Sequence, residues 1–314
     1  EFRRIAAGAA PRWHGRTCGI FDRTCEWYPG EDPYTGVIKS WLRLPLKQKA
    51  GAIKRRIFNA DEHSSYLYEK VLIKSRTIDA LIVKDERIAQ KFGKPVSWMP
   101  EIFRVFDHEA ASAADEDYQK YSDPIREYIQ RAGADNVLLY FGTGAWYKGY
   151  DWFLKLAHMD KSTFALHAGA PDRREAGKHY DYDVDALRNE LLAEGRLFET
   201  RSFVESNALV HQLFSSISRF VSTHRLTLSS GTCLQALEQG KPVLTPSTGL
   251  VGWRTREFGL GMTYSYRDMD AMAATWRDFK VGRDDPKPGT IQSFMKRFSR
   301  EETERYFVNM LMGA

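Results

Sequence analysis

The chain has 314 residues, of which 43% are hydrophobic and 28% charged, with a formal net charge of +5. These values are typical of an ordinary soluble globular protein with one large or two medium domains. No apolar run approaches the ~18 residues of a membrane span, and no signal-peptide pattern opens the sequence. Three scattered cysteines, Cys18, Cys25 and Cys233, argue against a disulfide framework and for a reducing compartment, so we expect a cytoplasmic protein.

The positive charge is concentrated near the N-terminus. The basic residues there are Arg3, Arg4, Arg12, Arg16, Arg23, Lys47, Lys49, Lys54, Arg55 and Arg56. Such a segment can serve nucleic acid, an anionic membrane surface or an anionic substrate, or can simply be a solvated helix face. Because no nucleic-acid-binding module is recognisable, we expect no nucleic-acid partner. A peripheral contact with an anionic membrane surface stays open.

The N-terminal third predicts short strands rather than a full sheet. Strands are expected at residues 18–21 and 80–83 and within 94–100, with a long helix over 49–74. Residues 106–136 are acidic and Ala-rich at first and read as a connector. Asp123-Pro124 is expected to start a helix within it, since proline suits the first turn.

From residue 137 onward, strand patterns alternate with helix patterns. The expected strands cover residues 137–141, 164–168, 196–203, 220–223 and 242–245, and the expected helices 151–158, 185–194, 206–214 and a segment ending at Gln239. This alternation predicts parallel βαβ units with right-handed crossovers. Residues 137–280 are therefore expected to form one doubly wound α/β domain, which binds ligands where its strands end. Residues 291–312 predict a final helix with these buried positions: Phe294, Phe298, Tyr306, Phe307, Met310 and Leu311.

A Ser/Thr/Gly turn precedes the helix that ends at Gln239. Its residues are Ser229, Ser230, Gly231 and Thr232, and they follow an apolar run. At a helix N-terminus several backbone N–H groups and the positive end of the dipole face one spot, which suits a phosphate. The same residues would also serve as an ordinary helix cap.

Four segments in a fixed order carry a family resemblance. They are LLYFGTGAWYKGYDWFLKLA (138–157), FALHAG (164–169), LFETRSFVESNALVHQLF (197–214) and HRLTLSSGTCLQALEQGKPVL (224–244). Together they resemble the C-terminal domain of glycosyltransferase family 4. The resemblance implies a GT-B α/β fold: two Rossmann-like domains facing across a cleft, the nucleotide-sugar on residues 137–280 and the acceptor on residues 1–105. It also implies that residues 281–314 form a helix that crosses back to the N-terminal domain.

The resemblance also implies a donor site. The residues expected at the diphosphate are Gly142, Thr143, Lys148, Ser229, Ser230, Gly231 and Thr232, and those expected near the nucleotide or sugar are His224, Arg225, Gln235, Glu238, Val204 and Glu205. Gln235 or Glu238 would contact the ribose. A charge on His224 or Arg225 would stabilise the leaving group, although a structural role for either stays open.

The sequence departs from the family pattern in three places. No arginine follows Gly142 to pair with Lys148, and the paired glutamates of the family fall at Thr227 and Gln235, which are not acidic. About 105 residues precede the connector, whereas a doubly wound acceptor domain needs roughly 150, so the N-terminal domain is expected to be reduced or incomplete.

Other site features leave alternatives open. His14 or Asp22 could serve as general base in an inverting enzyme, and a retaining enzyme would need neither. No metal or other cofactor is expected, and Asp181-Tyr182-Asp183 reads as a solvated loop. Three aromatic residues of one loop could stack on a base or sugar or merely pack: Trp146, Tyr147 and Tyr150. Residues 249–252 read as a turn near the sugar.

The resulting prediction is a hexosyltransferase-type glycosyltransferase. It would move a sugar from a nucleotide-diphosphate sugar to a saccharide or lipid-linked acceptor, in polysaccharide synthesis. The alternative is a non-catalytic GT-B protein that binds a nucleotide or glycan and serves a partner enzyme. A nucleotide-sugar epimerase on the same architecture would require acidic groups near the sugar, which the sequence does not offer.

Overall fold

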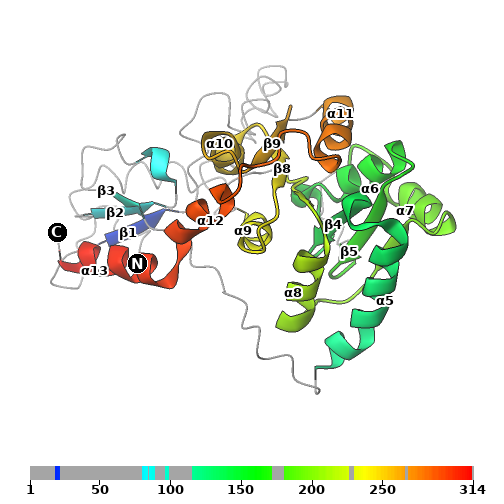
Figure 1. Cartoon of the computed structure of the whole chain (residues 1–314), viewed down its shortest axis with the longest axis horizontal. Helices are drawn as coiled ribbons and strands as arrows, with labels where there is room; N and C mark the ends of the chain where they lie inside the picture. The colour runs from blue at the N-terminus through cyan, green and yellow to red at the C-terminus, as the bar shows by residue number, and fades with distance from the viewer. Residues whose placement is uncertain are drawn as a thin grey trace, which may run out of the picture. The chain divides into compact units, whose positions relative to one another are not determined.

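A computed structural model describes residues 18–21, 80–83, 85–88, 96–98, 115–171, 180–225, 230–265 and 268–312 (Figure 1). The chain divides into two compact units, Glu1–Glu101 with Arg300–Ala314, and Ile102–Ser299. The helix predicted over residues 49–74 lies outside the described residues, as do His14, Asp22 and Ser229. The division into acceptor and donor domains stays a prediction.

The first unit contains a parallel three-stranded sheet in the order β1-β2-β3. Its elements are β1 (Cys18–Phe21), β2 (Ala80–Val83), the short η2 (Glu86–Ile88), β3 (Val96–Trp98) and α13 (Arg300–Met312). All three strands lie where the sequence predicts them. Helix α13 contacts β3, and the rings of Trp98 and Tyr306 meet edge to face with centroids 5.2 Å apart.

The described residues of the second unit contain six parallel strands. They are β4 (Val137–Phe141), β5 (Phe164–Ala168), β6 (Leu197–Glu199), β7 (Phe220–Val221), β8 (Val243–Pro246) and β9 (Gly261–Tyr264). They pair as β4-β5-β6 and β7-β8-β9, and β4 contacts β7. The order across the unit is therefore β6-β5-β4-β7-β8-β9, which is the doubly wound order of a Rossmann fold. The five strands predicted in this region are confirmed, and β9 adds a sixth.

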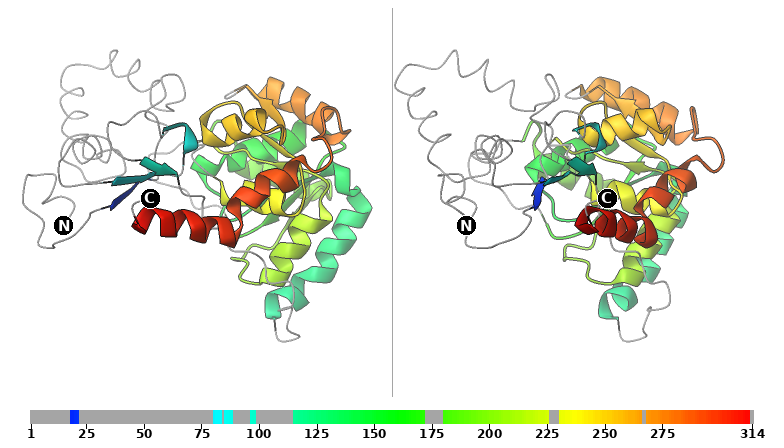
Figure 2. Two further views of the ribbon diagram at one scale, coloured as in Figure 1. Left: turned by 60° about the vertical axis from the view of Figure 1, so that its left-hand side comes forward. Right: turned by 90° about the vertical axis from the view of Figure 1, so that its left-hand side faces the viewer.

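Helices cover both faces of these strands (Figures 1 and 2). They are α5 (Glu116–Ala132), η3 (Ala134–Asn136), η4 (Trp146–Lys148), α6 (Tyr150–Met159), α7 (Val184–Ala193), α8 (Asn207–Ser216), α9 (Gly231–Glu238), α10 (Gly249–Glu257), α11 (Met269–Lys280), α12 (Thr290–Met295) and η5 (Lys296–Phe298). Leu138 and Tyr140 of β4 join a core with residues of α6, α7 and α11. Phe141 points the other way, and its ring lies 5.5 Å from that of Phe214 in α8. Alternate residues of β4 thus serve opposite layers, as a strand buried on both sides requires.

One predicted helix start is wrong. Helix α5 begins at Glu116, about two turns before Pro124, because Asp115 caps it by accepting a 3.1 Å hydrogen bond from the Tyr118 amide. Residues 249–252, predicted as a turn near the sugar, form the first turn of α10, and their nearness to a sugar stays a prediction. Gly252 lets that helix lie against β8, since a Cβ there would fall 2.2 Å from the carbonyl oxygen of Pro246.

The predicted final helix is interrupted. Residues 291–312 form α12, η5 and α13, with an extended Ser299 between the last two. Phe294 and Phe298 are buried as predicted. None of the helices in the described ranges is long and apolar enough to cross a membrane.

Candidate functional site

The strand order of the second unit reverses between β4 and β7. From β4 the chain winds toward β5 and β6, and from β7 toward β8 and β9. At such a reversal the loops that leave the two central strands diverge, and ligands of doubly wound sheets bind in the space between them. The candidate site is therefore built from residues 142–149, which follow β4, and residues 222–225, which follow β7.

Glycines bring the ends of β4 and β5 unusually close together. Gly142 adopts a φ of 107°, and its amide donates a 2.8 Å hydrogen bond to the carbonyl of Ala168. A Cβ on Gly169 would lie 2.1 Å from the Gly142 carbonyl oxygen, so no side chain fits there. The predicted diphosphate residue Gly142 therefore sits on a rigid edge. Thr143 follows it, half-buried, and its carbonyl accepts a hydrogen bond from the Tyr140 hydroxyl.

Lys148 folds back over Gly142. A Cβ on Gly142 would come within 2.7 Å of the Lys148 Nζ, so the absence of a side chain leaves space for the ammonium group. Burial lowers the pKa of Lys148. No carboxylate in the described ranges forms an ion pair with it. A half-buried cation without a counter-ion is a natural site for an anionic ligand.

The loop that carries Lys148 is held by the residues that follow β7. Three successive carbonyl groups of this loop accept hydrogen bonds. Arg225 donates two of them, from Nη1 to the Trp146 carbonyl (2.8 Å) and from its amide to the Tyr147 carbonyl (2.9 Å). The Thr223 hydroxyl donates the third, to the Lys148 carbonyl (2.8 Å). Gly149 completes the junction, because a Cβ there would lie 2.0 Å from the Thr223 carbonyl oxygen. The position of Lys148 is thus fixed across the β4–β7 junction.

The side chain of Arg225 is occupied inside the protein. It forms a two-pronged ion pair with the buried Asp151, with both distances 2.7 Å, and a third 2.7 Å contact with Asp181. Its guanidinium also lies over the rings of Trp146 and Trp152, 5.3 and 4.9 Å from their centroids. These contacts give Arg225 a structural role in holding residues 142–149, the lysine loop. Its predicted contact with a donor stays a prediction.

His224 lies next to Lys148. Its Nδ1 is 3.0 Å from Ser222 Oγ. Burial, together with the neighbouring charge of Lys148, lowers the pKa of His224 to about 4. His224 is therefore neutral at physiological pH, and any help it gives a leaving group would come from a hydrogen bond rather than from a charge.

The predicted phosphate turn opens α9. Ser230 Oγ caps the helix by accepting from the Cys233 amide at 3.3 Å and lies 2.8 Å from Thr232 Oγ1. The amides of Gly231 and Thr232 have no acceptor within the helix, as in any first turn. Both predicted roles, cap and anion site, are compatible with this geometry.

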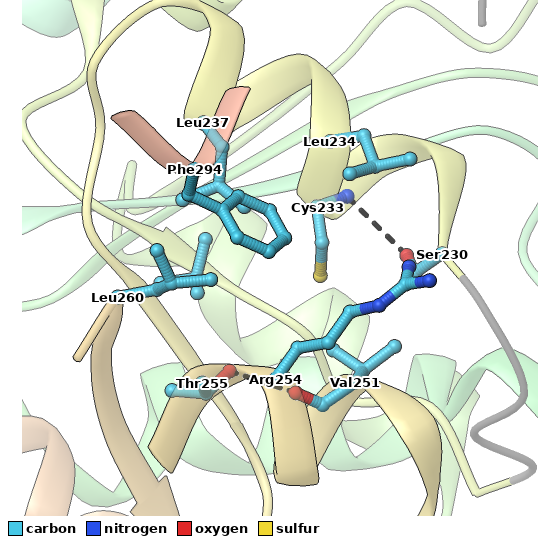
Figure 3. A pocket seen from close by; sticks show the side chains of 10 residues that line it. Ser230, Cys233, Leu234, Leu237, Val251, Arg254, Thr255, Leu260 and Phe294 are labelled. Atoms are coloured by element: carbon cyan, nitrogen blue, oxygen red, sulfur yellow. Dashed lines mark hydrogen bonds between the residues drawn. The ribbon is translucent and has the colours of Figure 1, made fainter. Parts of the chain in front are cut away.

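A small cavity lies beneath this turn (Figure 3). It has a volume of about 20 Å³ and lies mostly among apolar side chains of α9, α10 and α12, with Arg254 extending from α10 toward the start of α9. That is room for about one water molecule, so the cavity is a packing feature and not the nucleotide site.

Two predicted ribose contacts lie one turn apart on α9. Gln235 Oε1 and Glu238 Oε2 are buried, and neither has a hydrogen-bond partner among the described residues. Burial raises the pKa of Glu238 to about 7. A hydroxyl group of a ligand would supply the donors that these oxygens lack.

Val204 and Glu205 lie in the loop after β6. Val204 is buried, and the Glu205 amide donates a 3.0 Å hydrogen bond to Asp117 of α5. The loop is also held by Tyr121, whose hydroxyl donates to the carbonyl of Thr200 at 2.7 Å. No hydrogen bond or ion pair within the described ranges joins this loop to Lys148 or His224.

A polar network that the sequence does not predict lies behind Gly142. His167 Nε2 lies 3.0 Å from the Gly142 carbonyl oxygen, and Glu199 receives hydrogen bonds from Arg188 (2.9 Å) and Tyr150 (3.1 Å). Although burial alone raises the pKa of Glu199, the neighbouring imidazole of His167, whose Nδ1 lies 3.8 Å from Oε1, and the hydrogen bonds from Arg188 lower it to about 2. His167 and Glu199 are register partners in β5 and β6. The sequence does hint at this network, because His167 and Glu199 are polar residues within otherwise apolar strand segments.

The remaining predicted features have mixed outcomes. Tyr150 is fully buried in the core, whereas Tyr147 is 38% exposed with the Lys148 ammonium 5.9 Å from its ring centroid. The loop around Asp181 is structural as well as solvated, because Asp181 accepts from Trp152 Nε1 at 2.8 Å and Asp183 caps α7. Across the described ranges, no group of three or more His, Cys, Asp or Glu residues could hold a metal ion.

Comparisons with known proteins identify the fold. No protein-family model and no curated protein matches the sequence. Among solved structures, the chain resembles Anabaena HepE in complex with UDP, with 15% identity, a TM-score of 0.57, and coverage of 82% of this chain and 70% of HepE. It resembles WaaG, a glycosyltransferase of lipopolysaccharide biosynthesis, with 11% identity, a TM-score of 0.56, and coverage of 98% and 77%.

The chain is also similar to a third solved structure. Sucrose-phosphate synthase from Thermosynechococcus elongatus shares 12% identity and a TM-score of 0.53, over 84% of this chain and 66% of its own. The chain therefore has the α/β fold of GT-B glycosyltransferases with Rossmann-like units. Nothing ties it specifically to family 4.

Proposed function

We propose that the chain is a glycosyltransferase that binds a nucleotide-diphosphate sugar at the junction of β4 and β7. The observation that carries this proposal is the ammonium group of Lys148, half-buried over Gly142 without a counter-ion in the described ranges. The structural neighbour HepE has been solved with UDP and with UDP-glucose, which supports a nucleotide-sugar as ligand.

In this proposal each predicted donor residue has a task. Lys148 and the amides of Gly231 and Thr232 would hold the diphosphate, and Gln235 or Glu238 would accept hydrogen bonds from the ribose. The transferred group would be a hexose and the acceptor a saccharide or lipid-linked saccharide. His14 or Asp22 would act as base if the reaction inverts the sugar. A metal would not be needed, since Lys148 and the helix amides would neutralise the diphosphate.

Calorimetric titration with UDP, GDP, ADP, CDP and dTDP tests the proposal. We expect one nucleotide to bind selectively and Lys148→Ala to weaken its affinity at least tenfold, about the worth of one charge-assisted contact. Lys155→Ala is the matched control, because it removes an equal charge from α6, where Lys155 lies over the Tyr182 ring. Its affinity should stay within about twofold of that of the wild type.

Donor hydrolysis separates the transferase from a non-catalytic binding protein. We expect slow release of free sugar from the matching nucleotide-sugar, abolished by Lys148→Ala. Tight nucleotide binding without any turnover, with or without added glycan acceptors, would instead favour the binding protein. If none of the five nucleotides binds at millimolar concentration, the proposed donor site is wrong.

A further inference from the structure

Ser222 and His224 form a fixed pair at the end of β7. The Ser222 amide donates to the Leu244 carbonyl at 2.8 Å, and its carbonyl accepts from the Tyr264 hydroxyl at 3.0 Å. With its backbone bound on both sides and its side chain buried, Ser222 has little freedom. Its Oγ is 3.0 Å from His224 Nδ1, which is the one side-chain partner recorded for it in the described ranges.

The charges around His224 favour a neutral imidazole. The flanking residues Thr223 and Arg225 bind the carbonyls of Lys148 and Tyr147, and the charge of Lys148 lowers the pKa of His224. The neighbouring Arg225 is already paired with Asp151 and Asp181. No carboxylate of the described elements pairs with His224. Protonation would therefore place a second unpaired cation beside Lys148.

The contact with Ser222 fits either neutral tautomer of His224, and each tautomer sets a different direction for the hydrogen bond. A serine hydroxyl can donate to Nδ1, which leaves the proton on Nε2, or accept from Nδ1, which leaves Nε2 as a lone pair. A lone pair beside an anion would be repulsive, whereas an Nε2–H would donate to it. An anion held by Lys148 therefore selects the tautomer in which Ser222 donates to Nδ1.

We propose that His224 is a phosphate ligand that donates its Nε2–H to the diphosphate held by Lys148, and that Ser222 is a positioning residue that fixes this tautomer. The proposal rests on the proposed function and adds a ligand and its orienting partner to the same site. It also explains how this chain could hold a diphosphate without the arginine expected near Gly142.

Two amide substitutions test which nitrogen matters. In His224→Gln the side-chain amide NH₂ can reach the place of Nε2, whereas in His224→Asn the shorter amide replaces Nδ1 and leaves the place of Nε2 empty. Using the tightest-binding nucleotide of the five as probe, we expect Gln to keep the affinity within about threefold and Asn to lose roughly tenfold or more. Melting temperatures of both variants show whether folding is intact.

A double-mutant cycle tests the role of Ser222. Ser222→Ala should weaken nucleotide binding several-fold in the wild-type background and have no effect in the His224→Gln background, where no tautomer remains to be fixed. A purely structural serine would instead cost the same affinity in both backgrounds.

Two results would overturn the proposal: equal affinity losses in His224→Gln and His224→Asn, or no loss in either. Failure of the proposed function looks different, since the wild-type protein itself would then bind none of the five nucleotides. In that case the assignment of His224 falls with it.

Discussion

Among single side chains, Glu238 combines half-burial with an oxygen that has no hydrogen-bond donor among the described residues. Its carboxyl group holds its proton up to about pH 7 in the folded protein, whereas the unfolded chain loses it near the ordinary value of 4.5. The folded state therefore binds more protons than the unfolded state between these two values. The contribution of Glu238 to stability is fully present below pH 4.5 and is lost as the pH rises through 7.

Replacing this carboxyl group with a neutral amide should remove the penalty at high pH. We expect Glu238→Gln to be more stable than the wild type at pH 8, by about 1 kcal/mol after allowance for solvent screening, and equally stable at pH 4.5. Thermal unfolding at the two pH values measures the difference. Glu257→Gln, on the exposed side of α10, serves as control and should change little at either pH. An effect of Glu238→Gln that is the same at both pH values would contradict the burial argument.

A local sequence pattern indicates where Lys148 lies, whereas its role at a diphosphate stays a prediction. Lys148 was predicted because Lys-Gly follows a strand ending in glycine, and the structure places its ammonium over that glycine. The contact between His167 and Gly142 was not predictable, because it joins residues of two strands whose register only the folded sheet defines. The ion pair of Arg225 with Asp151 was missed for the same reason: its partners are 74 residues apart.

At the scale of elements, the site depends on close backbone contact between η4 and the end of β7. Gly149 has a φ of 69° and no room for a Cβ, while Gly195 has a similar φ of 67° and nothing within 4 Å of an added Cβ. An alanine at Gly195 would therefore cost stability only through its positive φ, whereas an alanine at Gly149 would add a steric clash with Thr223.

We expect Gly195→Ala to destabilise the protein by about 1 kcal/mol, the cost of a non-glycine residue at positive φ. Gly149→Ala should cost more than about 3 kcal/mol and should also weaken nucleotide binding, because η4 and Lys148 must move away from Thr223. Urea unfolding and calorimetry measure the two effects. Equal stability losses in the two variants would mean that η4 can move away from Thr223 at no cost beyond that of the backbone conformation.

Element prediction succeeded best for strands. The limits of β4 and β5 are those the sequence predicts, because short apolar runs between turn residues leave few alternatives. Helix starts were less certain. Pro124 suggested the start of a helix, yet the cap at Asp115 and the acidic residues Glu116 and Asp117 begin α5 earlier and carry it through the proline.

For the whole molecule, the described residues of the proposed site all belong to the unit Ile102–Ser299. The doubly wound fold of that unit is predictable from the alternation of strands and helices, whereas two domains and a C-terminal helix that returns to the first are implied by the family resemblance alone. Arg300–Ala314 belongs with Glu1–Glu101, although nearly 200 residues separate them in sequence.

This arrangement predicts where a bound nucleotide stabilises the protein. We expect the tightest-binding nucleotide to slow hydrogen exchange in peptides covering residues 142–149 and 222–225, and to leave those of β1 and β2 nearly unchanged. Some amides exchange only when the unit Ile102–Ser299 unfolds as a whole. When the nucleotide concentration is one hundred times its dissociation constant, the free energy of opening measured at these amides should rise by about 2.7 kcal/mol. Mass spectrometry measures both, with Lys148→Ala at the same nucleotide concentration as control. Comparable protection in β1 and β2 would contradict this localisation.

The carbonyl contacts of the lysine loop also bear on how the protein is made. Lys148 and Trp146 receive their hydrogen-bond donors from residues 75 and 79 positions later in the chain. During synthesis, β4, β5 and β6 are added to the chain before those donors, and residues 142–149 cannot reach their final shape until Thr223 and Arg225 have been added as well. Closing so long a loop costs conformational entropy, and only the full set of contacts between residues 146–148 and 223–225 offsets that cost. The growing chain thus contains the β4-β5-β6 half of its sheet first and gains its ligand-binding competence only when β7 and the residues after it join β4.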